Sequence, residues 1–346
     1  MRGVNTFSTY DSPFQFLTFA SPMSLTVENF SVLKKATAAQ SAALRTILYF
    51  DLFEHPLKEN EIFTLLRNKK TTDDEVSLAL QELCKAGLLH HQGGYFFLPG
   101  KNGTIERRLK GEAHAANSLK TAMKFSRRMS KFPFVRGISL SGSLSKNFMD
   151  NESDIDYFIV TAPERMWLAR TLLILYKKIF LLNSRKNFCV NYFLSEDNLE
   201  VPDKNIFTAT EVSFLLPTYN YDLYMRFRKA NIWSGDFLPN FPLRGKDYLI
   251  GDSRSLLKNL LEKMFSGSLG SRLDAYFFRI TIKFWKKKFR HFDESTFDFR
   301  LRSRKNVSKH HPLGYQEKIL GRYAERVAAF TRTNNILLHA ENTFHA

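Results

Sequence analysis

Two aspartates, Asp154 and Asp156, stand at the head of an apolar run that ends at Val160. The run has the length and composition of a buried β-strand. Because residues two apart in a strand point to the same side, both carboxylates are expected on one face, about 7 Å apart. Paired carboxylates at a strand end can hold Mg²⁺ or Mn²⁺, which prefer oxygen ligands. The spacing therefore predicts a metal site at these two residues.

A second apolar run, residues 135–140, precedes the aspartates and ends at Ser141, Gly142 and Ser143. This pattern predicts a strand, a tight glycine turn and a short helix. Backbone N–H groups at such a turn can approach a phosphate closely. The turn and the two acids together would hold a metal-bound triphosphate for in-line displacement at phosphorus.

The combination of Gly142-Ser143, a short spacer and Asp154-x-Asp156 resembles the signature of the DNA polymerase β-type nucleotidyltransferase superfamily. The specific match covers residues 134–161. The resemblance implies that Gly142 and Ser143 contact the nucleotide phosphates, and that Asp154 and Asp156 bind the metal. It also implies Mg²⁺-dependent transfer of a nucleoside monophosphate from an NTP to an acceptor that the sequence does not identify.

The family has a third carboxylate in a later strand, and here the matching position in the expected strand 187–194 is Asn191. An asparagine can ligate a metal through its carbonyl oxygen, but it carries no charge and cannot act as a base. Either Asn191 replaces the third acid, or Glu196, Asp197 or Glu200 supplies it from the following loop. The expected catalytic set is Asp154, Asp156 and Asn191.

Three other interpretations remain open. Asn191 favours a nucleotide-sensing or nucleic-acid-binding regulator that has lost turnover. A small interaction module is the second, although the long flanking regions argue against that minimal form. In the third, Asp154 and Asp156 only cap a loop and solvate a strand end.

The composition favours a folded protein that is attracted to polyanions. Its 346 residues suffice for two or three domains, and 44% of them are hydrophobic. The net charge of +17 favours contact with nucleic acid, nucleotides or an acidic surface. No apolar run reaches the roughly 18 to 20 residues of a membrane span. Cys84 and Cys189 have apolar neighbours and are expected to be reduced core residues of a cytoplasmic protein.

We expect an α/β (α+β) chain whose core is a nucleotidyltransferase fold with a short mixed sheet. The predicted segments are a flexible leader (1–36), a winged-helix-like domain (37–100), a basic connecting helix (101–131), the nucleotidyltransferase core (132–205) and a helical, basic C-terminal region (206–346). Within the winged-helix-like domain, Thr72 and Glu75 form a predicted capping box, and Gly93-Gly94 a predicted hairpin turn. Its third helix exposes mostly acidic or neutral side chains, which favours packing or protein contact over DNA reading.

Two basic stretches, residues 107–128 and 283–309, are candidates for binding nucleic acid or an acidic partner. A solvated helix face is the alternative for both. Residues 208–237 predict a helical stretch that Pro217 interrupts, and residues 253–345 predict further helices.

Overall fold

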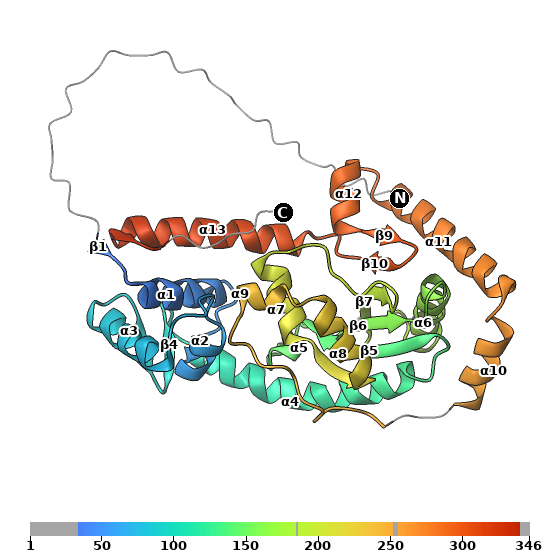
Figure 1. Cartoon of the computed structure of the whole chain (residues 1–346), viewed down its shortest axis with the longest axis horizontal. Helices are drawn as coiled ribbons and strands as arrows, with labels where there is room; N and C mark the ends of the chain where they lie inside the picture. The colour runs from blue at the N-terminus through green and yellow to red at the C-terminus, as the bar shows by residue number, and fades with distance from the viewer. Residues whose placement is uncertain (1–33, 185, 252–254, 340–346) are drawn as a thin grey trace, which may run out of the picture. The chain divides into compact units, whose positions relative to one another are not determined.

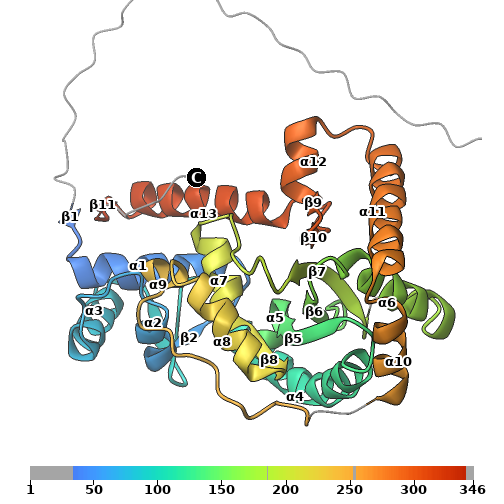
Figure 2. The ribbon, with the colours of Figure 1, turned by 45° about the vertical axis from the view of Figure 1, so that its right-hand side comes forward.

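The computed structural model describes residues 34–184, 186–251 and 255–339. Its centre is a six-stranded mixed sheet (Figures 1 and 2). In spatial order the strands are β8 (Leu216–Tyr219), β5 (Val135–Ser141), β6 (Asp156–Thr161), β7 (Cys189–Ser195), β10 (Val307–Lys309) and β9 (Ser303–Arg304). Strands β6 and β7 run parallel, and the other neighbours are antiparallel.

Strand β6 forms because its side chains alternate between two apolar layers. Tyr157 and Ile159, with the preceding Ile155, enter one core. Phe158 and Val160 enter the core on the opposite face. A strand with apolar residues on both faces must be covered on both sides.

Helices from distant parts of the chain cover the two faces of the sheet. The first face packs against α4 (Thr104–Met129), α6 (Met166–Phe180) and α11 (Ser268–Lys288). The second face packs against α7 (Ile206–Phe214) and α8 (Tyr221–Ala230). Strands β5 and β6 therefore lie in the interior, and only their ends can reach solvent.

The N-terminal part of the described chain holds three helices and a three-stranded sheet of order β2-β4-β3. These elements are α1 (Ala38–Asp51), β2 (Leu57–Lys58), α2 (Glu59–Thr64), α3 (Asp73–Lys85), β3 (His90–Gln92) and β4 (Tyr95–Phe97). The predicted capping box is confirmed, because Thr72 Oγ1 accepts from the Glu75 backbone N–H and Glu75 accepts from the Thr72 N–H. The predicted turn is also confirmed: Gly93 and Gly94 have φ of 58° and 80°.

The C-terminal helix α13 (Tyr315–Thr333) packs on this N-terminal part. Ile319, Tyr323 and Phe330 belong to the same apolar core as the residues of α1. Two short strands, β1 (Lys34–Lys35) and β11 (Ile336–Leu337), pair in parallel beside it. The ends of the described chain are thus joined by one core.

The chain beyond residue 205 contains strands as well as helices. The helix expected over residues 208–237 is instead α7, β8, α8 and α9 (Ser234–Phe237). Pro217 lies in β8, an edge strand of the sheet, where a missing N–H is tolerated. The C-terminal region is helical as expected, but α10 (Leu256–Met264), α11 and α12 (Glu294–Arg300) are followed by the short strands β9 and β10, and β10 pairs with β7.

The remaining expectations are met in part. The leader expected over residues 1–36 lies outside the described residues as far as residue 33. Cys84 and Cys189 are free and half-buried. None of the described helices is long and apolar enough to cross a membrane.

Candidate active site

The turn after β5 lies directly against Asp156. Ser141, the last residue of β5, pairs with Asp156, the first residue of β6. Gly142 opens the short helix α5 (Gly142–Ser145) with φ of 66°, a left-handed conformation that favours glycine. A β-carbon at Gly142 would lie 2.5 Å from Asp156 Oδ2. The sequence predicted both groups for one site, and the fold brings them into contact.

The two aspartates occupy different kinds of backbone. Asp156 belongs to β6, whereas Asp154 lies in the loop before the strand, with Ile155 between them. Both side chains are half-buried. The charge of Asp154 contributes to raising the pKa of Asp156, so the two carboxylates are close enough to interact.

Burial is the main reason that the pKa of Asp156 is raised to about 6. The negative charges of Asp154 and Glu211 raise this pKa further, whereas a hydrogen bond with Cys189 and the positive charge of Lys146 lower it. An acid in such a field gains from a bound cation, which would favour its ionised form. Without a cation, Asp156 is half protonated near pH 6.

Asn191 lies beside Asp156, as expected from its position in β7. Its Nδ2 donates a hydrogen bond to Asp156 Oδ1 at 2.9 Å. The Cys189 thiol donates to Asn191 Oδ1 at 3.3 Å. The side chain therefore presents its N–H to the acid, and its oxygen faces the Cys189 thiol, whose single proton is shared between Asn191 and Asp156.

The acids that follow β7 do not reach the site. Ser195 pairs with Thr161 at the other end of β6, and the Glu196 N–H donates to the Thr161 carbonyl at 2.9 Å. At about 3.3 Å per residue, this end of the strand is roughly 16 Å from Asp156. Glu200, farther along the same loop, pairs with Lys204 at 2.8 Å. The register of β6 and β7 thus places Glu196 and the adjacent Asp197 at the far end of β6 from Asp156, and Glu200 pairs with Lys204 instead.

Two charged residues at the site were not singled out from the sequence. Lys146 follows α5, and its Nζ donates to the Gly142 carbonyl at 3.0 Å and to Glu211 Oε1 at 2.8 Å. Glu211 comes from α7, on the second face of the sheet. Lys146 could have been noticed from its place four residues after Gly142, whereas Glu211 had no local signal.

The donor set fits a magnesium ion that a substrate helps to bind. Among residues 34–184, 186–251 and 255–339, no group of three or more His, Cys, Asp or Glu side chains is placed to hold a metal. Mg²⁺ in nucleotide sites is commonly bound by one or two carboxylates together with substrate phosphates and water. Asp154 and Asp156 offer such a set, and the Gly142 turn lies beside it.

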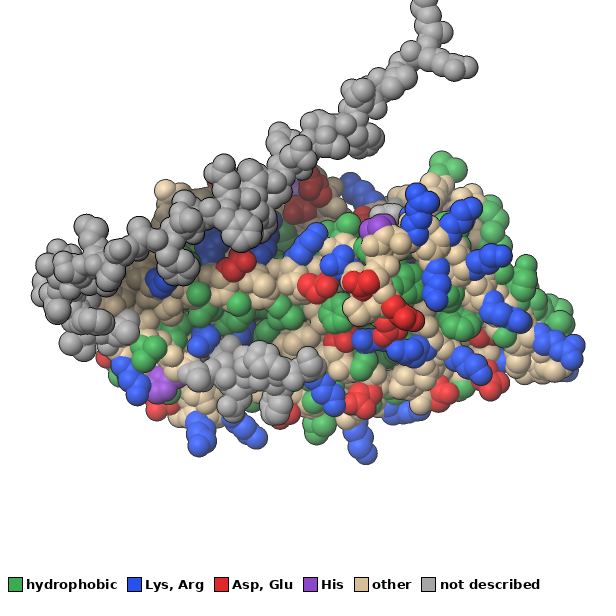
Figure 3. All heavy atoms as spheres, turned by 90° about the horizontal axis from the view of Figure 1, so that it is seen from above, with side chains coloured by type: hydrophobic (Ala, Val, Ile, Leu, Met, Phe, Trp, Pro, Cys, Tyr) green, Lys and Arg blue, Asp and Glu red, His purple; other side chains and the backbone are tan. Residues whose placement is uncertain are grey.

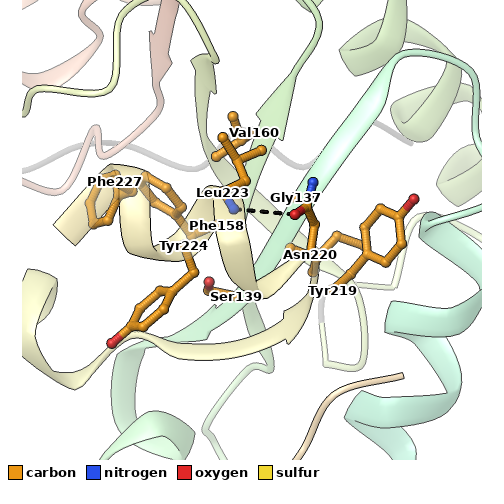
Figure 4. Close-up of a pocket in the computed structure, with 10 residues that line it drawn as sticks. Gly137, Ser139, Phe158, Val160, Tyr219, Asn220, Leu223, Tyr224 and Phe227 are labelled. Atoms are coloured by element: carbon orange, nitrogen blue, oxygen red, sulfur yellow. Dashed lines mark hydrogen bonds between the residues drawn. The ribbon is translucent and has the colours of Figure 1, made fainter. Parts of the chain in front are cut away.

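A small hollow on the second face of the sheet is distinct from this site. Figure 4 shows its lining, which includes Gly137 and Ser139 of β5 and the side chains of Phe158 and Leu223. The Leu223 N–H donates to Asn220 Oδ1 at 3.2 Å at its rim. None of the predicted site residues lines it, and its walls are mainly apolar.

The predicted phosphate contacts, Ser141, Gly142 and Ser143, therefore lie together with Asp156 and Asn191 at one end of β5, β6 and β7. Asp154 joins them from the preceding loop. Comparisons with protein-family models, with curated proteins and with solved structures found no match for this chain.

Proposed function

We propose that this chain is a Mg²⁺-dependent nucleotidyltransferase that moves a nucleoside monophosphate from an NTP to an unidentified acceptor. The observation that carries the proposal is the contact between Gly142 and Asp156, where a β-carbon would be 2.5 Å from a carboxylate oxygen. It joins a turn suited to phosphate with an acid suited to metal. That pairing is what the resemblance to polymerase β-type enzymes led us to expect.

In this proposal the chain's own residues bind and orient the triphosphate. Backbone N–H groups of Gly142 and Ser143 contact phosphate oxygens, while Asp154 and Asp156 hold the metal. When bound, Mg²⁺ or Mn²⁺ neutralises charge on the phosphates and favours displacement at phosphorus. Lys146, which contacts the Gly142 carbonyl and pairs with Glu211, lies beside the turn.

The raised pKa of Asp156 gives this site a pH dependence. Burial and the charges of Asp154 and Glu211 raise that pKa to about 6. Because only the ionised acid ligates a cation well, metal affinity is expected to increase as the pH rises through this value.

A nucleotide-binding regulator without turnover is the second candidate. The observation that favours it is the Asn191 amide, which donates to Asp156 at the position of the family's third acid. An amide adds no negative charge and cannot take a proton from an acceptor hydroxyl. Such a site would bind an NTP and transfer nothing.

The N-terminal part supports a winged-helix assignment, because its order is α1-β2-α2-α3-β3-β4 and its sheet order is β2-β4-β3. Helix α3 has Asp73, Asp74 and Glu75 in its first turn. We propose that this domain serves packing or protein contact, because DNA phosphates repel acids.

The proposed nucleic-acid or acidic partner has its best surface on α11. Lys283, Lys286, Lys287 and Lys288 are exposed there, and Figure 3 shows basic and hydrophobic side chains interspersed on the side where Figure 1 places α11. Elsewhere in the two basic stretches several cations are engaged internally. These are Arg107, Arg108, Lys110, Arg300, Arg302, Arg304 and Lys309, each paired with an acid. A cytoplasmic location is proposed with this function, on the two free cysteines.

The proposal is tested by incubation with each α-³²P-labelled NTP, Mg²⁺ or Mn²⁺, and RNA, DNA or protein acceptors. Label transfer that Asp154→Ala/Asp156→Ala abolishes would support the transferase and identify its nucleotide. Metal-dependent NTP binding without transfer would favour the regulator. Neither binding nor transfer would reject both candidates.

A further inference from the structure

Arg244 is a half-buried cation with no acidic partner in the described part of the chain. Its Nη2 donates to the Ser145 carbonyl at 3.2 Å, at the end of α5. Its guanidinium lies over Phe214 and Phe241, 5.2 and 5.3 Å from the ring centres. Its Nε is buried and has no hydrogen-bond acceptor. Two aromatic rings and the Ser145 carbonyl therefore hold the side chain in place, and its guanidinium still has an N–H group that donates no hydrogen bond to the described residues.

Arg228 on α8 repeats this situation close by. Its Nη1 donates to the Val212 carbonyl at 3.0 Å and to Ser234 Oγ at 3.4 Å, both neutral acceptors. Within the described residues its Nε is also buried without an acceptor, and no acid pairs with it. Two guanidinium groups in one region thus lack a counter-ion.

Tyr224 connects the two arginines. Its hydroxyl is buried and has no side-chain hydrogen-bond partner among the described residues. Burial raises the pKa of Tyr224, whereas the positive charge of Arg228, a hydrogen bond from the Arg244 backbone and the positive charge of Arg244 oppose that shift. The hydroxyl therefore lies within the field of both guanidinium groups, one from α8 and one from the segment after α9.

A buried cation without a counter-ion is unfavourable, because it has lost its hydration and gained no opposite charge. Burial lowers the pKa of both Arg228 and Arg244 for this reason. A bound anion would remove the deficit. Phosphate fits best, because the planar guanidinium donates two parallel hydrogen bonds to its oxygens.

The location indicates which phosphate. Arg244 contacts Ser145, the last residue of the helix that Gly142 opens. Lys146 next to it contacts Gly142 and lies 5.6 Å from the Phe214 ring centre, the same ring that carries Arg244. Lys146, which also pairs with Glu211, and Arg244 therefore both lie beside the proposed nucleotide turn.

We propose that Arg228, Arg244 and the Tyr224 hydroxyl form a phosphoryl-binding site that receives the triphosphate tail of the nucleotide. This inference rests on the proposed function for the identity of the ligand. Asp154 and Asp156 hold the metal, and the arginines hold the outer phosphates on the side of α7 and α8. The site discriminates triphosphates from monophosphates.

The test is calorimetric titration of the full chain with tripolyphosphate without metal, and with ATP or AMP plus Mg²⁺. Arg244→Gln and Arg228→Gln are expected to weaken tripolyphosphate binding about tenfold or more, because each removes a charge-assisted contact. Both variants are also expected to weaken the binding of ATP more than the binding of AMP. Arg226→Gln is the matched control on α8, because Arg226 is exposed and donates to the Glu196 carbonyl at 3.3 Å. It should change binding less than twofold.

Tyr224→Phe keeps the ring and removes only the hydroxyl, so it tests the site if an arginine variant does not fold. It is expected to weaken the binding of tripolyphosphate and to leave the binding of AMP unchanged. Wild-type protein that binds no tripolyphosphate, or variants that bind it as the wild type does, would overturn the inference. If Asp156→Asn abolishes Mg²⁺-dependent ATP binding while the arginine variants retain it, the arginine site is wrong and the proposed function stands. If tripolyphosphate binding depends on the arginines but no NTP binds with metal, the proposed function fails instead.

Discussion

Gly142 approaches Asp156 so closely that a β-carbon on the glycine would lie 2.5 Å from Asp156 Oδ2. The glycine also has φ of 66°, which side chains with a β-carbon disfavour. Gly142→Ala is therefore expected to lower the unfolding free energy by about 1–3 kcal/mol and to displace the acid. Thermal denaturation and Mg²⁺-dependent NTP binding measure the two effects.

Gly235 provides the control for this substitution. A β-carbon there would meet no atom within 4 Å, and its φ lies outside the left-handed region. Gly235→Ala should leave NTP binding unchanged and stability within about 1 kcal/mol. Normal NTP binding by Gly142→Ala would contradict the assignment of this turn to phosphate.

Asp156 is expected to lower the stability of the ligand-free protein at neutral pH. Burial and nearby acids raise its pKa from 3.8 to about 6, so the folded state binds its proton more tightly than the unfolded state. Protonation of Asp156 therefore stabilises the folded state. This stabilisation is complete below about pH 4 and is lost as the pH rises through 6. A pKa difference of about two units between the folded and unfolded states corresponds to a loss of about 3 kcal/mol in the free energy of unfolding.

Asp156→Asn removes this titration. The unfolding free energy of the variant relative to the wild type should rise by about 3 kcal/mol between pH 4 and pH 7. Asp203→Asn is the control of opposite sign: Asp203 is also buried, but Lys309 and Arg302 lower its pKa, so its loss destabilises at pH 7. Chemical denaturation at several pH values measures both. If Asp156→Asn is no more stable than the wild type at pH 7, the negative charge of Asp156 is already balanced in the folded state and the prediction is wrong.

The local parts of this fold were predictable from the sequence. Strands β5 and β6, the Gly142 turn and the Thr72 cap each follow from residues close together in the chain. The place of Asn191 beside Asp156 was also predicted, because the resemblance assigned it to the position of the third acid.

What could not be predicted depends on contacts between distant segments. Strand β8 contains Pro217 and is stable only as the edge partner of β5. Strand β10 is short and forms because β7 offers it a partner. Glu211 reaches the site only because α7 packs on the second face of the sheet, and no local pattern encodes that placement.

Asn191→Asp tests whether the site lacks only a third acid. A carboxylate beside Asp156 repels it without metal and attracts a cation. The variant should melt at a lower temperature than the wild type without Mg²⁺ and show a larger rise when Mg²⁺ is added. Asn191→Ala should also melt lower but gain no added response. Equal Mg²⁺ responses of the two variants would place Asn191 outside the metal site.

Glu211 and Lys146 are expected to shift the ionisation of Asp156 in opposite directions. Glu211→Gln removes a negative charge and releases Lys146, so the pKa of Asp156 should fall below about 6. Lys146→Met removes a positive charge, so that pKa should rise. Carbon-13 NMR of labelled aspartate follows the titration. Shifts of the same sign in both variants would contradict the arrangement of these charges.

Arg108 of α4 forms ion pairs and hydrogen bonds that connect this helix to the N-terminal part. Its buried guanidinium contacts Glu61 at 2.6 Å and Glu112 at 2.8 Å, and it also donates to the Pro56 carbonyl. Glu61→Gln should cost on the order of 3 kcal/mol, because it leaves a buried cation only partly neutralised. Glu106→Gln, which breaks the exposed pair with Lys110, should have no measurable effect on the melting temperature.

The contribution of the Arg108–Glu61 pair to stability is expected to depend on pH. Burial alone would raise the pKa of Glu61, but hydrogen bonds from Arg108 and from the Lys58 backbone lower it overall. Its stabilising effect is present above the ordinary glutamate pKa of 4.5 and is lost as the pH falls through the lowered value. Equal acid sensitivity of wild type and Glu61→Gln would contradict this role.

The most direct test of the central claim is calorimetric titration of the full chain with each NTP at pH 7.5, with and without Mg²⁺. We expect at least one NTP to bind only when metal is present, and Asp156→Asn to lose that binding while remaining folded. Binding that is equal with and without metal, equal in the variant, or absent for every NTP would contradict the assignment of Asp154, Asp156 and the Gly142 turn to a metal–nucleotide site.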